Sequence, residues 1–535
     1  MNRFHIIFSI LLAAHPGRAQ TDPFQIFLEP MTIEGLPGVQ AYAYAQSNGL
    51  WLIIGGRIDG LHQRQPFAGF LAEGRNTEIS VIDPLAEKVW RLPLTSLSIP
   101  LQDQMSSTNM EFYQDGNHLY LVGGYGHSQT IDAKLTYALI TAIDIDSVIH
   151  AVQEKSDLSP FFRQLTDVQL AVTGGHLAKF GDIYYLIGGQ KFDGNYNPMN
   201  HPTFTQSYTN AIRKFTIDDD GQTLKVMHLP SVIDTTGFHR RDYNVVPQIF
   251  PDGKHGVTAF SGVFQLQADI PMLHAVNIDE NGYQPAEGFA QYYNHYHCAN
   301  LPMYSAASHE MHTVFFGGIA QYYEQDGILT EDSDVPFVKT ISRVTREAGG
   351  RMAEYKLPLE MPQFLGASAC FILASDVPVF DNGVIKMDEL KADSNMVGYI
   401  FGGIESTAPN IFWINDGEES VAQNVLYKVY VVKHPLTSTH LLNAQSTNGN
   451  QLQIYPNPAV ETFTFLYHLV KQGKVLLTVS SESGKILLQE DLSQQLVTGN
   501  NRFTKKIKSF KIGGVYMVTI TTDGNASTQR IIVKE

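Results

Sequence analysis

The chain has 535 residues, two cysteines and a formal net charge of -16, with 43% hydrophobic and 17% charged residues. This composition excludes a disordered or fibrous protein, and the length predicts at least two domains. Two cysteines exclude a disulfide framework and a four-cysteine zinc site. The acidic balance argues against nucleic acid as a partner.

Residues 1–19 have the pattern of a secretory signal peptide. Arg3 gives a positive start, residues 6–14 are almost wholly apolar, and Gly17-Arg18-Ala19 offers small residues for cleavage. No later segment reaches the roughly 18 consecutive apolar residues of a membrane helix, so no transmembrane segment is predicted. A buried strand or helix at the start of the fold is the alternative to a signal peptide.

Residues 20–440 contain six copies of one pattern. A short apolar run ends in a double glycine five times, and a degenerate sixth copy ends in Ser-Gly; the last glycines are Gly56, Gly124, Gly189, Gly262, Gly318 and Gly403. Each run has the length of a strand, and each is flanked by one earlier strand and two later ones. The pattern therefore predicts six four-stranded antiparallel meanders, with few helices.

This pattern resembles the kelch repeat, which forms the blades of a β-propeller. The best copy has Gly55-Gly56, then Asp83-Pro84, then Trp90, Leu92 and Pro93, whereas the other copies lack the tryptophan. The resemblance implies an all-β fold with a six-bladed propeller over residues 20–440; a seventh blade would have to use residues 374–397. A propeller closes its ring to avoid exposed strand edges. We therefore expect FQIFLEP, residues 24–30, to supply the fourth strand of the last blade.

The C-terminal segment differs from the propeller region in pattern. After a polar linker at residues 441–452, short strands and turns over residues 453–535 predict a small β-sandwich. The segment resembles the C-terminal sorting domain of the type IX secretion system of Bacteroidetes; the matching residues are Tyr455-Pro456-Asn457-Pro458, Gly484-Lys485, Gly514-Val515-Tyr516 and Ile531-Ile532-Val533. This resemblance implies export by the type IX machinery, to the medium or the outer-membrane surface. An ordinary ligand-binding sandwich is the alternative.

Long loops follow four of the glycine pairs and carry candidate binding residues. Aromatic and polar side chains on loops of a rigid scaffold suit the recognition of a sugar or a peptide. The candidates are His62, Arg64, Tyr196, Tyr322, Tyr323 and Trp413. Exposed aromatic residues that bind nothing are the alternative.

Two shorter segments precede inner strands and are expected at the mouth of the propeller channel. They contribute the binding candidates Arg240, Arg241, Asp242, His295, Tyr296 and His297. The first three could hold a carboxylate or a sugar acid, as the analogy with kelch sialic-acid epimerases implies, or could form an internal ion pair. Two histidines two residues apart on a strand face the same side, so His295 and His297 are weak metal candidates without further ligands.

The two cysteines are candidates for a disulfide. Cys298 and Cys370 fall on the inner strands of adjacent predicted blades, in an oxidising compartment. Tyr296, His297 and Cys298 also match the residue types of galactose-oxidase-like copper enzymes, which use a kelch propeller, but not their arrangement across blades. No cofactor is predicted.

Two functions compete at this point. The first is a secreted or surface-attached propeller that binds a protein or a glycan. The alternative is an extracellular enzyme acting on a sugar or sugar acid, epimerase-like, mutarotase-like or oxidase-like, at the channel mouth. His, Arg, Asp and Tyr converging there would favour the enzyme, and an aromatic loop face without such a cluster would favour binding. A structural adhesion component is a third hypothesis.

Overall fold

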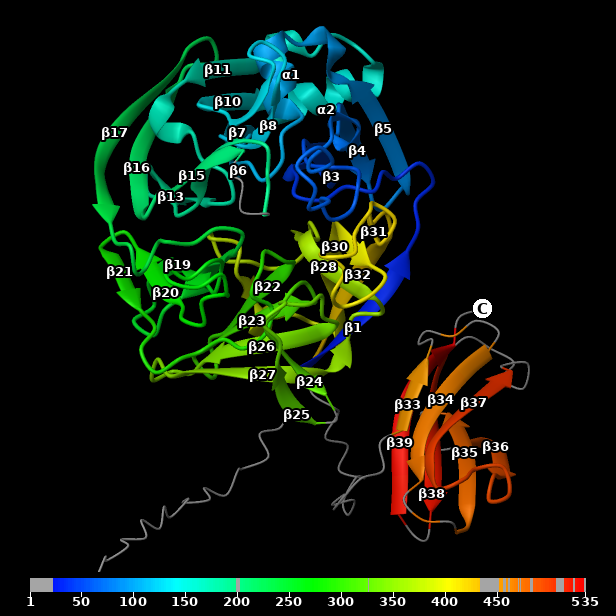
Figure 1. Cartoon of the computed structure of the whole chain (residues 1–535). Coiled ribbons are helices and arrows are strands. Elements are labelled where there is room, and N and C mark those ends of the chain that lie inside the picture. The colour runs from blue at the N-terminus through cyan, green and yellow to red at the C-terminus, as the bar shows by residue number, and fades with distance from the viewer. Residues whose placement is uncertain are drawn as a thin grey trace, which may run out of the picture. The chain divides into compact units, whose positions relative to one another are not determined.

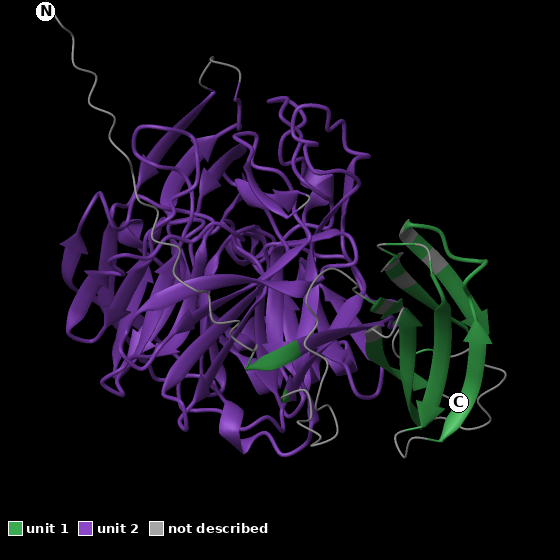
Figure 2. Cartoon of the chain, turned by 90° about the horizontal axis from the view of Figure 1, so that it is seen from below, with its two compact units in different colours: residues 1–25, 433–535 green, residues 26–432 purple. Residues whose placement is uncertain are grey.

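The computed structural model of the chain contains two compact units, one of Ile26–Val432 and one of Met1–Gln25 with Lys433–Glu535 (Figure 2). The structure describes residues 23–198, 203–325, 327–433, 452–455, 459, 462–469, 471, 473–481, 485–506, 514–522 and 525–533. The predicted signal peptide and nearly all of the predicted linker lie outside these ranges.

Six sheets of four or five strands, almost all antiparallel, build the larger unit (Figure 1). The first contains β2 (Ala43–Ser47), β3 (Leu50–Ile54), β4 (Glu78–Asp83) and β5 (Lys88–Pro93). The second contains β6 (Glu111–Asp115), β7 (His118–Val122), β10 (Leu139–Asp144) and β11 (Phe162–Thr166). The third contains β12 (His176–Phe180), β13 (Ile183–Ile187), β16 (Ala211–Asp219) and β17 (Leu224–Ile233).

The remaining three sheets follow the same plan with additions. The fourth contains β18 (Asn244–Ile249), β19 (His255–Phe260), β20 (Val276–Asp279) and β21 (Gly282–Pro285). The fifth contains β22 (Asn300–Ser305), β23 (Glu310–Phe316), β26 (Thr340–Arg346), β27 (Met352–Glu360) and the short parallel β29 (Ile385–Lys386). The sixth contains β28 (Phe364–Leu373), β30 (Ser394–Ser406), β31 (Ser420–Ala422), β32 (Leu426–Lys433) and the N-terminal β1 (Phe24–Met31).

The outer strand of the sixth sheet comes from the start of the chain. Strand β1 is hydrogen-bonded to β32, at the position that the sequence predicts for residues 24–30. The stretch that a seventh blade would need is fully described and forms no sheet of its own, because it adds only β29 to the fifth sheet and the first residues of β30 to the sixth.

The second strand of the first sheet is buried on both faces. Leu52 and Ile54 of β3 pack in a cluster with residues of the second sheet. The alternate residues Trp51 and Ile53 pack in another cluster with the sixth sheet, where the Trp51 and Tyr399 rings lie 5.0 Å apart. Since side chains of a strand alternate between its two faces, β3 packs against the second sheet with one face and against the sixth sheet with the other. This explains why its sequence is a continuous apolar run.

The glycine pairs permit a close approach between consecutive sheets. Gly123 has a φ of +64°, and a Cβ there would lie 1.9 Å from the carbonyl oxygen of Val172. The next residue, Gly124, donates its N–H to that same oxygen at 2.9 Å. Glycine is required because only a residue without a side chain fits this contact and adopts this backbone conformation freely.

The same N–H bond recurs in all six sheets. Each second glycine donates to a carbonyl near the start of the inner strand of the next sheet, at 2.8–3.1 Å: Gly56 to Ser107, Gly124 to Val172, Gly189 to Arg240, Gly262 to His295, Gly318 to Leu365 and Gly403 to Val39. The last bond runs from the sixth sheet back to the segment before the first.

A second set of backbone hydrogen bonds joins the inner strands near their starts. Each N–H donates to the carbonyl of the previous sheet, at 2.8–3.2 Å: Asn109 to Ala41, Gly174 to Asn109, Asp242 to Gly174, His297 to Asp242, Ser368 to His297 and Ala41 to Ser368. These six bonds form a closed cycle, which we call the peptide ring. Most of its residues have positive φ, among them the non-glycine residues Ala41, Asn109, Asp242 and Ser368.

Several connections differ from the sequence-based expectation. Three of the segments after the glycine pairs form hairpins: β8 (Tyr125–Ser128) with β9 (Ala133–Thr136), β14 (Gln190–Gly194) with β15 (Phe204–Tyr208), and β24 (Tyr322–Gln325) with β25 (Ile328–Glu331). Two α-helices, α1 (Ile99–Met105) and α2 (Ile145–Glu154), lie in the connections of the first two sheets. Helix α2 is amphipathic, and the carboxylate of Asp144 caps it by accepting the N–H of Ser147.

The C-terminal strands form two sheets over one apolar core. One contains β33 (Leu452–Tyr455), β34 (Thr462–Leu469) and β37 (Gly499–Lys506); the other contains β35 (Val475–Ser481), β36 (Ile486–Asp491), β38 (Gly514–Thr522) and β39 (Asn525–Val533). Alternate residues of β34 and β35, including Phe463, Phe465 and Leu477, pack in a common cluster. This alternation is the one that a small sandwich requires.

Candidate functional site

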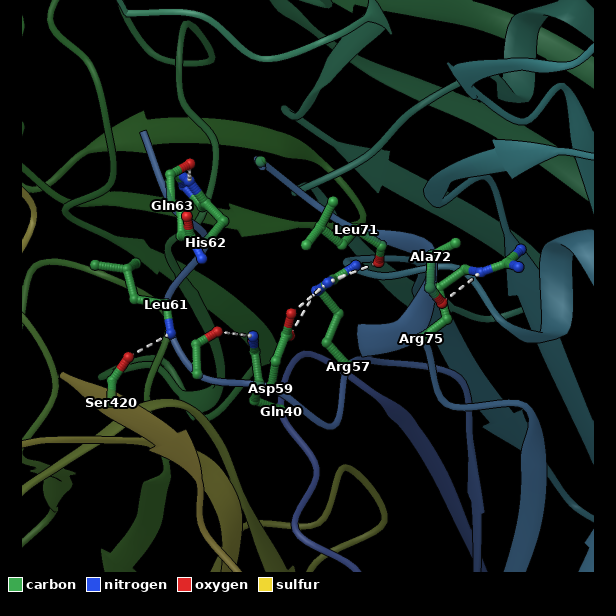
Figure 3. Close-up of polar contacts among 12 residues, drawn as sticks. Gln40, Arg57, Asp59, Leu61, His62, Gln63, Leu71, Ala72, Arg75 and Ser420 are labelled. Atoms are coloured by element: carbon green, nitrogen blue, oxygen red, sulfur yellow. Dashed lines mark hydrogen bonds and ion pairs between the residues drawn. The ribbon is translucent and has the colours of Figure 1, made fainter. Parts of the chain in front are cut away.

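The loops that follow β3 and β30 hold each other in place. Residues 59 and 421 form a β-bridge, and the backbone N–H of Leu61 donates to Ser420 Oγ at 2.8 Å (Figure 3). The side chain of Gln63 donates to the carbonyl of Asp416 at 2.7 Å. Hydrogen bonds therefore join the loop of the first sheet to the loop of the sixth.

A buried arginine bonds to both ends of the first of these loops. Arg57 is 3% exposed, forms an ion pair with Asp59, and donates to the carbonyl of Leu71 at 3.0 Å (Figure 3). Its guanidinium also lies 5.5 Å from the ring centre of Phe70. Because one side chain contacts both ends of the loop, the exposed segment between them is held in a defined conformation.

Aromatic side chains surround His62, one of the predicted binding residues. Its ring stacks on Phe70 with centroids 4.5 Å apart and meets Tyr196 edge-on at 4.6 Å. Burial, together with the positive charges of Arg57 and Arg241, lowers the pKa of His62 to about 4. The imidazole is thus neutral at physiological pH and packs as an aromatic group.

Six exposed apolar side chains lie on the same two loops and on β31, which follows the second loop. Phe67 is 81% exposed, Trp413 is 53% exposed, and the guanidinium of Arg64 lies 5.0 Å from the centre of the Trp413 ring. We call the exposed set the loop patch; it consists of Ile58, Phe67, Leu71, Trp413, Ile414 and Val421. Of these residues only Trp413 is among the sequence candidates, because the others are aliphatic or phenyl groups whose exposure depends on how the loops fold.

The structure separates the three neighbours predicted at the channel mouth. Arg240 is fully buried, and its guanidinium donates to the carbonyls of Gly237 at 2.7 Å and Ser261 at 2.8 Å. Its other terminal nitrogen lies 2.9 Å from Nε2 of His274, so the guanidinium is engaged within the protein, and a binding role for Arg240 stays a prediction. Arg241 and Asp242 are half-buried and form an ion pair, the alternative that the sequence leaves open.

The second predicted segment is also divided. His295 is fully buried; one ring nitrogen contacts the Gln291 carbonyl at 2.9 Å, and the other accepts the N–H of Gln321 at 3.0 Å. Both ring nitrogens of His295 therefore have protein partners, and a metal-binding role for this residue stays a prediction.

The three tyrosines predicted for binding in this region are half-buried. Tyr296 lies in the segment before β22, and Tyr322 and Tyr323 lie on β24. The ring of Tyr322 meets that of His295 edge-on, at 6.2 Å between centroids. Tyr322 and Tyr323 belong to a connection of the fifth sheet, so they are not part of the loop patch.

A cavity of about 230 Å³ lies between the inner strands. All six sheets line it, through segments at and just after the peptide ring. Asp242 and His297 belong to its wall, as do Cys298 and Cys370. Of the residues predicted for binding, the cavity thus brings together one acid and one histidine.

Two further titratable residues in the cavity wall are not singled out by the sequence analysis. Glu111 is 1% exposed, and burial raises the pKa of its carboxyl to about 8. The ring of His176 lies 5.7 Å from that of His297, and burial lowers the pKa of His176 to about 3 and that of His297 to about 4. Both imidazoles are therefore neutral, and Nε2 of His176 donates to the carbonyl of Tyr243.

The predicted disulfide is not formed. Cys298 and Cys370 are both free, buried thiols, and burial raises the pKa of each to about 12. Each thiol has its own neighbour: the amide of Asn244 lies 3.7 Å from Cys298 Sγ, and Tyr42 lies against Cys370. Throughout the described part of the chain, no three His, Cys, Asp or Glu side chains converge in a way that could hold a metal ion.

The residues of the sorting motif fall partly within the C-terminal sheets. Tyr455 ends β33, Gly514 begins β38, and Tyr516 is buried in the core. Pro456, Asn457 and Pro458 lie outside the described residues.

Comparison with known families identifies this C-terminal segment. Residues 453–534 match the family model described as the secretion system C-terminal sorting domain. The match supports sorting by the type IX secretion system, so the protein is secreted or attached to the cell surface, with that machinery as a partner. Among the described residues, none of the helices has the length and apolar character needed to span a membrane.

The remaining comparisons are distant. No curated protein matches the chain. A fungal alcohol oxidase of the AA5 family, solved in complex with copper, is 10% identical over 96% of this chain and 100% of its own, with a TM-score of 0.38. The structure of YjhT is 12% identical over 75% of this chain and 98% of its own, with a TM-score of 0.41. Neither similarity assigns an activity to this chain.

Proposed function

We propose that this protein is a secreted, six-bladed, kelch-like β-propeller that binds an extracellular protein through the loop patch. In this proposal residues 1–19 are the signal peptide, residues 20–440 the propeller, residues 441–452 a linker, and residues 453–535 the sorting domain. Export follows from the sorting-domain match, and the binding role rests on the surface that the propeller would present outside the cell.

Two cycles of hydrogen bonds support the ring architecture. The glycine N–H bonds lead from each sheet to the next and return from Gly403 to Val39, and the peptide ring returns from Ala41 to Ser368. The pairing of β1 with β32 joins the two ends of the unit within one sheet. A closed ring leaves no inner strand edge exposed, which favours this arrangement over an open one.

The observation that carries the binding role is the loop patch. Its six apolar side chains are between 41% and 81% exposed, on two loops that hydrogen-bond to each other and on the adjoining β31. Exposed apolar groups that cluster in this way mark interaction sites, and the centres of protein interfaces are enriched in aromatic residues and arginine. Phe67, Trp413 and Arg64 fit that composition. The aliphatic members, such as Ile414, favour a protein partner over a glycan.

The test is a screen of the purified full-length protein on microarrays of extracellular proteins and of glycans. We expect binding to a protein target and a loss of affinity of about 30-fold in the double variant Phe67→Ser/Trp413→Ser, because burial of anchor aromatics dominates interface energies. The matched control is Leu85→Ser/Met227→Ser, which removes two side chains that are 76% and 62% exposed, at the turn after β4 and on β17. Binding to glycans alone, or equal binding by both double variants, would overturn the proposal.

The enzymatic alternative has less support from the site. A sugar acid needs a cation to hold its carboxylate, but Arg240 is buried and bonded to carbonyls, and Arg241 is paired with Asp242. The carboxyl and imidazole groups of the cavity form a separate site, whose chemistry does not suit an acidic ligand.

A further inference from the structure

The cavity between the inner strands has the size of a small-ligand site. Its volume of about 230 Å³ is about eight times the share of one water molecule in the liquid, which is ~30 Å³. Asp242, His176 and His297 in its wall are half-buried, so the cavity is not sealed from solvent. The residues of the cavity wall make no part of the loop patch.

The wall of the cavity carries two acidic side chains. Glu111 and Asp242 line the cavity, and within the described part of the chain no lysine or arginine lines it. Arg241 pairs with Asp242 but is not itself a lining residue, so Glu111 is the lining carboxyl group that has no ion-pair partner among the described residues. His176 and His297 add no positive charge at neutral pH, because burial holds their pKa values well below 7.

One carboxyl oxygen in this wall has an unused bonding capacity. Oε1 of Glu111 accepts the N–H of Gly175 at 2.7 Å. Its other oxygen, Oε2, is buried and has no hydrogen-bond partner among the described residues. A buried carboxyl oxygen without a partner is costly, and a ligand that supplies a positive charge or an N–H offsets that cost.

Two features of the same wall favour a donor-bearing or cationic ligand further. Because Nε2 of His176 donates to a carbonyl, the other ring nitrogen of this neutral imidazole is a hydrogen-bond acceptor. Tyr44, Phe112 and Phe371 line the cavity from three different sheets and are half-buried. Ring faces attract an organic cation electrostatically, most strongly where water is excluded. Aromatic faces and a carboxyl group around one small space are the combination that recognises ammonium groups.

We propose that this cavity binds a small organic ammonium ion, held by the carboxyl group of Glu111 and enclosed by the aromatic rings of Tyr44, Phe112 and Phe371. The site is separate from the loop patch, so its occupancy does not depend on whether the loop patch binds a protein. A ligand with only anionic groups is disfavoured, because it would face the Glu111 oxygen without a lining cation.

Titration calorimetry on the full-length protein at pH 8.5 tests the charge requirement with matched probes. Choline is compared with 3,3-dimethylbutan-1-ol, which replaces its nitrogen by carbon, and ethanolamine is compared with ethylene glycol. We expect at least one cation to bind saturably, with an affinity about 10-fold or more above that of its neutral counterpart, which corresponds to about 1.4 kcal/mol. The comparison uses unaltered protein, so it does not depend on a variant folding.

The same titration at pH 6 gives a second readout. Burial raises the pKa of Glu111 to about 8, so at pH 6 the cation must displace a proton from this carboxyl. We therefore expect weaker binding of the cation at pH 6 than at pH 8.5, and no such change for the neutral counterpart. An affinity for the cation that is equal at both pH values would count against Glu111 as its partner.

The variant Glu111→Gln locates the bound cation. Glutamine keeps an oxygen for the Gly175 N–H but removes the charge, so we expect cation affinity at pH 8.5 to fall about 10-fold. The control is Glu347→Gln, which removes a carboxylate that pairs with exposed Arg351 at 2.6 Å and should leave binding unchanged. The proposal is wrong if neither cation binds more tightly than its neutral counterpart, or if Glu111→Gln binds the cation as the unaltered protein does.

Discussion

The buried carboxyl group of Glu111 links the stability of the fold to pH. Burial and the nearby charge of Asp242 raise its pKa to about 8, while Arg213 on β16 opposes this rise. The folded state therefore holds the Glu111 proton up to about pH 8, whereas the unfolded chain releases it near 4.5. Because the unfolded state binds fewer protons between these values, this group lowers the free energy of unfolding as pH rises through the window.

Glu111→Gln removes this dependence. Relative to the unaltered protein, the variant should gain stability from pH 5 to pH 8, by on the order of 2–4 kcal/mol. Denaturant unfolding of both proteins at several pH values measures the difference. Burial also raises the pKa of Glu354 to about 8. Glu354 titrates in both proteins, so its contribution cancels in the difference between them. A difference in stability that stays constant from pH 5 to pH 8 would contradict a raised pKa for Glu111.

The place of Glu111 in the cavity could not be predicted from the sequence. Glu111 and His176 occupy equivalent places, each two residues after a member of the peptide ring. Their segments predict inner strands correctly, but nothing in either segment indicates that both side chains share a cavity with Asp242 and His297. That convergence depends on strands from sheets that are far apart in the chain.

Burial also decides the role of two residues that the sequence analysis does single out. Arg240 and His295 are polar groups in segments expected at a channel mouth, and their residue types suit a ligand. Both are fully buried, and their polar atoms bond to the protein itself. Residue type alone does not reveal this, because one backbone partner of each residue, Ser261 for Arg240 and Gln321 for His295, is more than 20 residues away in the chain.

At the scale of elements, the strands are the part that the sequence predicts best. In the first five sheets the glycine copies follow the end of a strand, whereas Gly402 and Gly403 lie within β30. In each case the backbone must approach the next sheet, and this requirement leaves a visible mark in the sequence. The sequence predicts loops after the pairs, whereas three of these segments form hairpins, since strands as short and polar as β8 and β9 have no clear alternation. Helix α2 is not predicted, although Ile145, Val148, Ile149 and Val152 have the spacing of one helical face.

The close approach at Gly123 can be tested by a single methyl group. Gly123→Ala places a Cβ 1.9 Å from the Val172 carbonyl oxygen at a positive φ, so we expect it to reduce the free energy of unfolding by about 2–4 kcal/mol. The matched control is Gly116→Ala, where φ is +58° but the added Cβ meets no heavy atom within 4 Å among the described residues beyond its chain neighbours. The control should cost about 1 kcal/mol, from backbone conformation alone. Chemical denaturation of both variants measures the free energy of unfolding. Equal losses in the two variants would show that the close approach to Val172 adds no cost of its own.

At the scale of the whole molecule, the proposed ring explains why both candidate sites exist. The loop patch combines loops of the first and sixth sheets, and the cavity uses the inner strands of all six. Both depend on the first and sixth sheets being neighbours, which in turn depends on β1 completing the sheet that contains β32. The pairing of β1 is predictable only from the rule that a propeller avoids open edges, because nothing in FQIFLEP itself indicates its partner strand.

Hydrogen exchange of the full-length protein, followed by mass spectrometry, tests this closure most directly. The comparison is between β1 and the outermost strands of two other sheets, β17 and β27, which have the same place in their sheets. If the ring is closed, the hydrogen-bonded amides of residues 24–31 should exchange as slowly as those of β17 and β27, because all open only with the fold. Exchange of residues 24–31 at the rate of a free chain terminus, while β17 and β27 stay protected, would contradict the closed ring and with it the shared basis of both sites.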